Sequence, residues 1–215
     1  MLNYEAFNQE VFERVPANAK KILDVGCGTG VLGKALKEQY PSRIVYGITY
    51  SGEEYEIAKQ VLDEVVIADI NQNIPEIKEA FDCIIFSHIL EHTLYPHKIL
   101  LTFSSLLIEG GVVLVALPNV LFFKQRMKFL QGKFEYSENG GLMDNTHFRF
   151  FDWTTAETMI NKAGLSITTK KAVGYFPLPF LRKVFPHLAE KIDTFSLTKW
   201  PGLFGFQFVF TASKV

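Results

Sequence analysis

The chain has 215 residues, of which 48% are hydrophobic, and its formal net charge is −1. We expect a single domain over residues 1–215, because a chain of this length can bury a sizeable core. The near-zero charge argues against a nucleic-acid partner. Charged and glycine residues interrupt the most apolar stretch, which argues against a transmembrane segment.

The two cysteines, Cys27 and Cys83, lie far apart in apolar segments, which is poor spacing for a disulfide or a zinc site and fits a reducing compartment. Near the N-terminus, acidic residues stand where a secretion signal would carry lysines. We therefore expect a cytoplasmic protein.

In the first half of the chain, short β-rich apolar runs alternate with amphipathic segments of helix length. Helices are predicted after the first four of these runs, the third helix being short, and a turn at 109–111 precedes the fifth run. The alternation predicts an α/β fold with a mostly parallel sheet that is buried on both faces. The five predicted strands are "KILDV" (21–25), "IVYGI" (44–48), "EVVIA" (64–68), "FDCIIFS" (81–87) and "GGVVLVAL" (110–117).

A different pattern follows Pro118. We predict a helix over about 154–163, a strand over about 165–173, and a last strand at the alternating "FGFQFVFTAS". These elements complete a seven-stranded sheet with a C-terminal antiparallel hairpin. The core covers about 18–118, and two cap insertions, about 119–150 and a proline-rich irregular one at 176–202, are expected to form a lid.

The segment "KILDVGCGTGVLGKAL" carries glycines directly after the first predicted strand, where open α/β sheets bind ligands. "GTGVLG" (Gly28, Gly30, Gly33) satisfies the dinucleotide pattern G-x-G-x-x-G. Because the strand ends at Val25, however, that pattern should begin at Gly26, and its third glycine would then fall on Val31. An NAD-dependent oxidoreductase is therefore only our third hypothesis.

The same segment resembles motif I of the class I S-adenosylmethionine-dependent methyltransferases, an acid two residues before G-x-G-x-G. The resemblance covers roughly 20–173, since "IVYGITYS", "VVIADI" and "FDCIIFSHILEH" match the ends of the family's next three strands. It implies a Rossmann-like fold and S-adenosyl-L-methionine as cofactor. The cofactor-binding residues it implies are Asp24, Gly26, Cys27, Gly28, Gly30, Thr49, Tyr50, Asp69, Ile70, Ser87 and His88.

The resemblance also implies roles. Asp24 would anchor the methionine end, Asp69 would bond the adenine amine, and Ser87 and His88 would offer backbone carbonyls to the ammonium group. One position departs from the pattern: the second strand ends in Thr49, where the family has an acid for the ribose hydroxyls. Losing a charge-assisted hydrogen bond costs about 1.5 to 3 kcal/mol.

Glu53 and Glu54 could compensate for that missing acid, or simply open a helix. The departure also motivates a rival hypothesis, a non-catalytic or regulatory binding domain with the same fold.

His88, Glu91 and His92 spell H-x-x-E-H, a metalloprotease spacing, but that motif belongs inside a helix and these residues directly follow a predicted strand. Quinone-biosynthesis O-methyltransferases carry a similar E-x-x-E-H that is associated with a divalent ion. Here His88 replaces the first glutamate, which weakens an all-oxygen site. We therefore predict no metal, with Glu91 and His92 in structural packing.

The stretch "GLMDNTHFRFFDW" provides the candidate catalytic residues. An oxygen nucleophile must lose its proton, and a histidine is suited to take it. We predict His147 as the base with Asp144 orienting it. The alternative is that "HFRFF" only docks the cap. The stretch and the residues before it also resemble a bacterial methyltransferase subgroup associated with glycan or cell-surface polysaccharide synthesis, which implies a small-molecule or glycan acceptor.

Finally, "NVLFFKQRMKFLQGK" carries Lys124, Arg126, Lys128 and Lys133 and no acid. A basic amphipathic segment can contact anionic lipid or bind a phosphate-bearing substrate, although it can also be a solvated helix face. With the aromatic and basic "FPLPFLRKVFPHL" it could frame a pocket for a lipid-linked or nucleotide-linked sugar.

Overall fold

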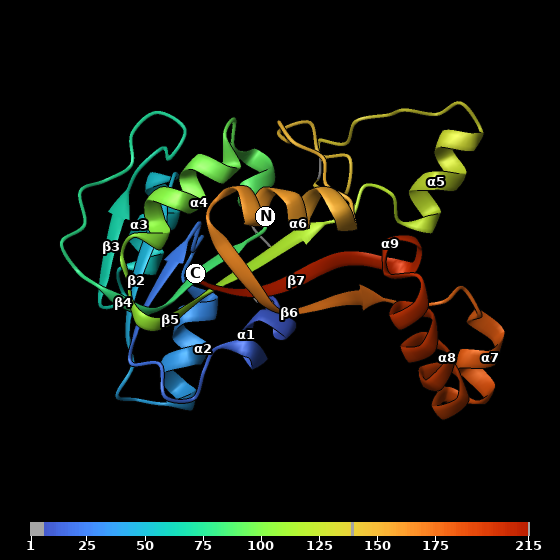
Figure 1. Ribbon diagram of the computed structural model, residues 1–215, viewed down its shortest axis with the longest axis horizontal. Coiled ribbons are helices and arrows are strands. Elements are labelled where there is room, and N and C mark those ends of the chain that lie inside the picture. The colour runs from blue at the N-terminus through green and yellow to red at the C-terminus, as the bar shows by residue number, and fades with distance from the viewer. Residues whose placement is uncertain (1–6, 139, 215) are drawn as a thin grey trace.

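The computed structural model describes residues 7–138 and 140–214 and consists of one seven-stranded sheet with helices on both faces (Figure 1). The strand order is β3-β2-β1-β4-β5-β7-β6. The first five strands are parallel, and β7 runs antiparallel to both β5 and β6. This confirms the predicted sheet and its C-terminal hairpin. The strands are β1 Lys21–Val25, β2 Ile44–Thr49, β3 Glu64–Ile67, β4 Phe81–Ser87, β5 Leu107–Pro118, β6 Leu165–Gly174 and β7 Gly205–Lys214.

Helices cover both faces of the sheet (Figure 1). The elements α1, α2 and α3 pack on one face, and α4 and α6 pack on the other. The helices are α1 Gln9–Arg14, α2 Val31–Gln39, α3 Gly52–Ala58, α4 Pro96–Ser104, α5 Phe123–Leu130, α6 Trp153–Lys162, α7 Pro179–Val184, α8 Pro186–Lys199 and α9 Pro201–Phe204, with a 3-10 turn η1 at Leu90–His92. Within the described part of the chain, no helix is long and apolar enough to cross a membrane.

Two apolar clusters, one on each face, form the core. Successive side chains of a strand point to opposite faces, so in β4 Ile84 and Phe86 join the cluster under α4 and α6, whereas Cys83 and Ile85 join the cluster under α1 and α2. Phe86 packs edge-on against Phe103 of α4, with ring centroids 5.7 Å apart. The unbroken apolar run of β4 therefore reflects burial on both sides.

The prediction of an irregular segment at 176–202 is wrong, because most of it is helical. Each of α7, α8 and α9 begins with a proline, at Pro179, Pro186 and Pro201. Proline is well tolerated in the first turn of a helix, where its missing N–H would have no intrahelical partner. The prolines that suggested irregular structure are helix starts.

Two smaller predictions also differ. Residues 68–80 contain no helix; Asp69 accepts hydrogen bonds from the amides of Asn71, Gln72 and Asn73, which closes a turn before Pro75. The expected turn at 109–111 instead lies inside β5, where Gly110 has a φ of 75° and the pairing with β4 shifts register.

Candidate active site

The crevice of this fold lies where the strand order reverses, between β1 and β4. The loop from β1 to α2 passes there through Gly26, Gly28 and Gly30, whose φ angles of 81°, 54° and 80° are in the left-handed region. A Cβ on Gly26 would lie 2.9 Å from Ile89, so only glycine fits at that position.

A cavity of about 640 Å³ opens at this loop. Of the predicted cofactor residues, Gly26, Thr49, Tyr50, Asp69 and Ile70 line it, which brings together the ends of β1, β2 and β3. The remaining lining residues are Ile48, Ala68, Asn71, Ile89, His92, Thr93, Asn145, Thr146 and Phe148.

Asp24 lies under this loop near the end of β1 and is 3% exposed. Burial raises the pKa of this carboxyl to about 7. A buried acid without a cation is costly in its charged form, so the site is suited to a ligand that brings a positive charge. Cys27 and Cys83 are also buried, and desolvation raises the pKa of both thiols, which makes them unreactive.

Thr49 ends β2 and is 2% exposed. Its hydroxyl donates to Oε2 of Glu54 over 2.5 Å, and Ser51 caps α3 by accepting from the amide of Glu54. A Cβ placed on Gly28 would lie 3.9 Å from Oε1 of Glu54, so this carboxylate sits beside both the glycine loop and the end of β2. Glu54 therefore lies in the first turn of α3 and also places a carboxylate at the end of β2, where Thr49 stands in place of an acid.

Ser87 ends β4 and His88 follows it, but neither is among the residues that line the cofactor cavity. His88 has a φ of 55°, the single positive value for a non-glycine residue among those described, and strain of this kind is typical of functional loops. Its ring contacts Oε1 of Glu91 at 3.2 Å and Oε1 of Gln207 at 2.7 Å. Desolvation lowers the pKa of His88, but the hydrogen bond and negative charge of Glu91, together with the hydrogen bond to Gln207, outweigh it, so the pKa is raised.

The predicted base, His147, lies in a cluster with Glu91 and His92, whose ligand atoms are all within 4.8 Å of one another. The rings of His92 and His147 have centroids 4.7 Å apart, and His92 lines the cavity. Nδ1 of His147 and Oε2 of Glu91 are buried without a hydrogen-bond partner among the described residues. Desolvation lowers the pKa of His147 although the Glu91 carboxylate opposes this. Two histidines and a carboxylate could also hold a divalent cation.

Asp144 does not hydrogen-bond to the His147 ring. Its Oδ1 accepts from the amide and the hydroxyl of Thr146, at 2.8 and 2.6 Å, and the Thr146 hydroxyl also contacts Nδ1 of His92 at 3.0 Å. The carboxylate that faces His147 is that of Glu91. Glu91 belongs to the H-x-x-E-H pattern, but the sequence predicts only a packing role for it.

Only the first insertion reaches the cofactor cavity, through Asn145, Thr146 and Phe148, and the backbone oxygen of Glu91 anchors it by accepting from the amides of Phe148 and Arg149. None of the lining residues comes from 176–202. The second insertion lies at the other end of the molecule, beside α5 (Figure 1). The two insertions therefore do not form one lid over the crevice.

A family model described as a methyltransferase domain matches residues 3–170, so the chain belongs to this family. The crevice fits the family's cofactor, S-adenosyl-L-methionine, because the glycine loop lets a ligand approach the backbone and a buried acid lies beneath that loop.

Among curated relatives, the mouse mitochondrial ubiquinone biosynthesis O-methyltransferase is 26% identical over 174 residues, which is 75% of this chain and 45% of the relative. A ubiquinone biosynthesis O-methyltransferase of Haemophilus ducreyi is 33% identical over 46% of each chain. The chain spans about half the length of the curated relatives it matches.

Among solved structures, an S-adenosylmethionine-dependent methyltransferase of Mesorhizobium loti superposes with a TM-score of 0.64 at 15% identity, covering 94% of this chain and 95% of that one.

Proposed function

We propose that the protein transfers the methyl group of S-adenosylmethionine to a hydroxyl oxygen of a small-molecule or glycan acceptor. The observation that carries the proposal is the Glu91–His92–His147 cluster beside the cofactor cavity. The relatives named for O-methyl transfer also support oxygen as the acceptor atom.

The cofactor supplies an electrophilic methyl group when bound. We propose that the Asp24 carboxylate holds the methionine end, Asp69 contacts the adenine, and the Glu54 carboxylate takes the ribose hydroxyls in place of Thr49. Thr49 then holds Glu54 in place through their 2.5 Å hydrogen bond. Gly26, Gly28 and Gly30 let the backbone approach the ligand closely.

The acceptor oxygen forms a bond to carbon as the carbon–sulfur bond breaks, and its proton must leave. We propose that His147 takes this proton, with Glu91 rather than Asp144 stabilising the protonated ring. A neutral imidazole with an unpartnered Nδ1 is able to accept it. His147 does not itself line the cavity, whereas His92 does and its ring packs edge-on against the His147 ring, so we propose that His92 positions the acceptor or relays the proton.

A second candidate for the same cluster is a divalent cation held by Glu91, His92 and His147, favoured by the two orphaned buried atoms. Such an ion would lower the pKa of a bound hydroxyl. The ion predicts loss of turnover after chelation and recovery on adding metal, whereas the histidine base alone predicts no effect of chelator.

The test of the base is His147→Asn, assayed by transfer of labelled methyl into cell-envelope fractions and into small phenols and sugars. Turnover should fall roughly 100-fold or more, while the affinity for S-adenosylhomocysteine in calorimetry stays near that of the wild type. Unchanged turnover would exclude the role. Asp144→Asn is the matched control and should have the smaller effect. Binding of S-adenosylhomocysteine without transfer to any acceptor would favour the non-catalytic alternative.

A further inference from the structure

The end of the molecule away from the cofactor crevice is formed by residues 119–134 and 176–202, which we call the basic cap. It contains α5, α7, α8 and α9 and projects beyond the sheet (Figure 1). None of the residues that line the cofactor cavity belongs to it.

The basic cap is strongly charged in a nearly neutral protein. It contains eight lysines and arginines and two acids, a net charge of +6, whereas the whole chain carries −1 and the remainder therefore carries −7. One of its acids, Asp193, is paired with Arg182. Among the described residues, none of the other seven cationic side chains of the cap makes an ion pair, so their charge is available to a partner.

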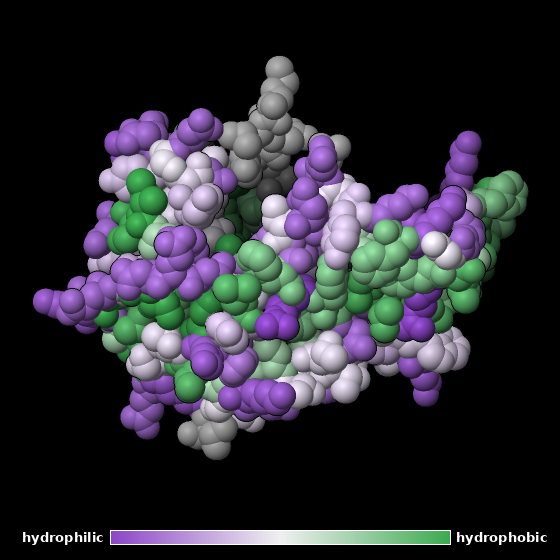
Figure 2. Space-filling model, turned by 90° about the horizontal axis from the view of Figure 1, so that it is seen from above, coloured by the Kyte–Doolittle hydropathy of each residue, from purple (hydrophilic) through white to green (hydrophobic). Residues whose placement is uncertain are grey.

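The basic cap is also unusually apolar on its surface. With 43 of the 215 residues, it holds nine of the 21 large hydrophobic side chains that are exposed in the described chain. Leu130 is 80% exposed and Phe180 is 79% exposed. The helix α7 buries none of its residues, and the 14 residues of α8 bury only Ala189 and Ser196. In Figure 2 hydrophobic and hydrophilic side chains interleave over this end of the molecule.

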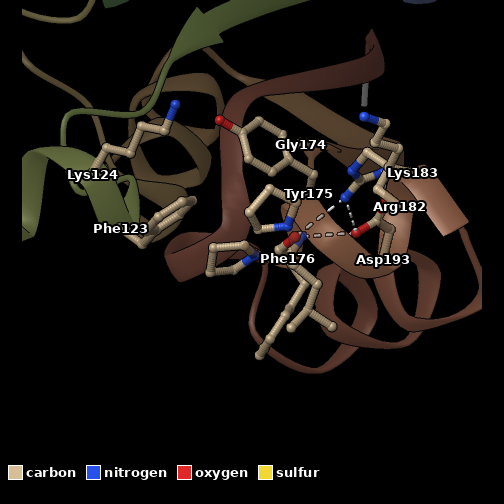
Figure 3. A pocket seen from close by; sticks show the side chains of 11 residues that line it. Phe123, Lys124, Gly174, Tyr175, Phe176, Arg182, Lys183 and Asp193 are labelled. Carbon is tan, nitrogen blue, oxygen red and sulfur yellow. Dashed lines mark hydrogen bonds and ion pairs between the residues drawn. The ribbon is translucent and has the colours of Figure 1, made fainter. Parts of the chain in front are cut away.

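A pocket of about 820 Å³ joins the start of α5 to the segment 174–183 (Figure 3). Its wall is aromatic, and cations lie on both sides of Tyr175: Lys124 Nζ is 5.4 Å from the ring centroid, and the Arg182 guanidinium is 5.5 Å from it. Aromatic rings beside cations favour the boundary between a bilayer's phosphates and its acyl chains.

We infer that the basic cap docks the protein on an anionic lipid bilayer. Its lysines and arginines complement the lipid phosphates, and its exposed phenylalanine, leucine and tryptophan side chains enter the headgroup region. A second copy of the chain is a poorer occupant, because two caps of charge +6 would repel each other. Nucleic acid would use the cations but leave the exposed aliphatic residues uncovered. The inference does not depend on the methyl acceptor.

The experiment is co-sedimentation of the full chain with vesicles of phosphatidylcholine alone or of phosphatidylcholine mixed with phosphatidylglycerol. We expect binding to the mixed vesicles, weak binding to the neutral ones, and weakening by salt. Each basic residue near an anionic surface strengthens binding roughly fivefold. The double variant Lys128→Gln/Lys183→Gln should therefore lose at least about tenfold in partitioning.

The apolar contribution is tested by Leu130→Ser/Phe180→Ser, which removes two exposed side chains and should weaken binding to the same vesicles. The matched controls lie outside the basic cap: Lys34→Gln/Lys78→Gln for charge and Ile57→Ser/Ile67→Ser for exposed apolar area. Both should bind as the wild type does. Circular dichroism and bound S-adenosylhomocysteine check that every variant is folded, and they report on the crevice independently of the cap.

Three results would overturn the inference. The first is no preference for anionic vesicles, and the second is equal loss of binding in the cap variants and their controls. The third is a concentration-dependent dimer, or a complex with a nonspecific RNA, that the cap variants abolish while vesicles are not bound.

Discussion

If the Glu54 carboxylate accepts hydrogen bonds from the ribose hydroxyls of the cofactor, substitutions at Thr49 and Glu54 should affect the affinity for S-adenosylhomocysteine in an interdependent way. Glu54→Gln keeps the size of the side chain and one acceptor oxygen but removes the charge. A hydrogen bond to a charged group contributes about 1.5 to 3 kcal/mol, which corresponds to roughly 10- to 150-fold in affinity. Because glutamine retains part of the contact, we expect a loss near the lower end, about tenfold.

Thr49→Asp provides a stricter test, because it should lower the affinity for S-adenosylhomocysteine when residue 54 is glutamate and raise it when residue 54 is glutamine. In the wild-type background the new carboxylate would stand against Glu54, at the position where Oγ1 now lies 2.5 Å from Oε2, and like charges at that distance should weaken binding. In the Glu54→Gln background the same substitution restores an acid at the end of β2 and should recover affinity. Calorimetry with S-adenosylhomocysteine measures all four proteins.

The matched control is Glu53→Gln, because Glu53 lies in the same first turn of α3 and is exposed. It should change affinity by less than about twofold if only the helix dipole is affected. Equal effects of Glu53→Gln and Glu54→Gln, or additive effects of Thr49→Asp and Glu54→Gln, would refute the ribose contact.

Three further substitutions test the scaffold by urea unfolding. The pKa of Asp24 in the folded protein, about 7, lies above its ordinary value, so the stabilising contribution of this residue is complete below pH 4 and is lost as pH rises through 7. The free energy of unfolding of the wild type should therefore fall by about 4 kcal/mol relative to that of Asp24→Asn between those pH values. Parallel pH profiles of the two proteins would contradict this. Asp152→Ala breaks the capping box with Thr155 at the start of α6 and should cost about 1 kcal/mol; no change in the unfolding midpoint would show that the cap is dispensable. Phe86→Ala, at a fully buried site, should cost about 3 to 5 kcal/mol, and a cost below about 1 kcal/mol would mean that the core relaxes around it.

Local sequence patterns were enough to predict the strands of the sheet and the position of the ligand crevice. Apolar runs such as β4 predict strands because a strand buried on both faces has no polar side to alternate with. Glycines directly after Val25 predict a ligand cradle because glycine adopts without strain the positive φ angles found at Gly26, Gly28 and Gly30. The prediction of an irregular segment at 176–202 failed because proline can either break a helix or begin one. Helices begin at Pro179, Pro186 and Pro201.

By itself the sequence determined the order of the strands along the chain, the motif that identifies the cofactor, and the residue types available for proton transfer, because these depend on short-range periodicity and spacing. Only the tertiary structure decided which of those residues meet. Glu91 rather than Asp144 faces His147, and the two insertions lie at different places, because whether segments far apart along the chain meet depends on how the whole sheet is assembled.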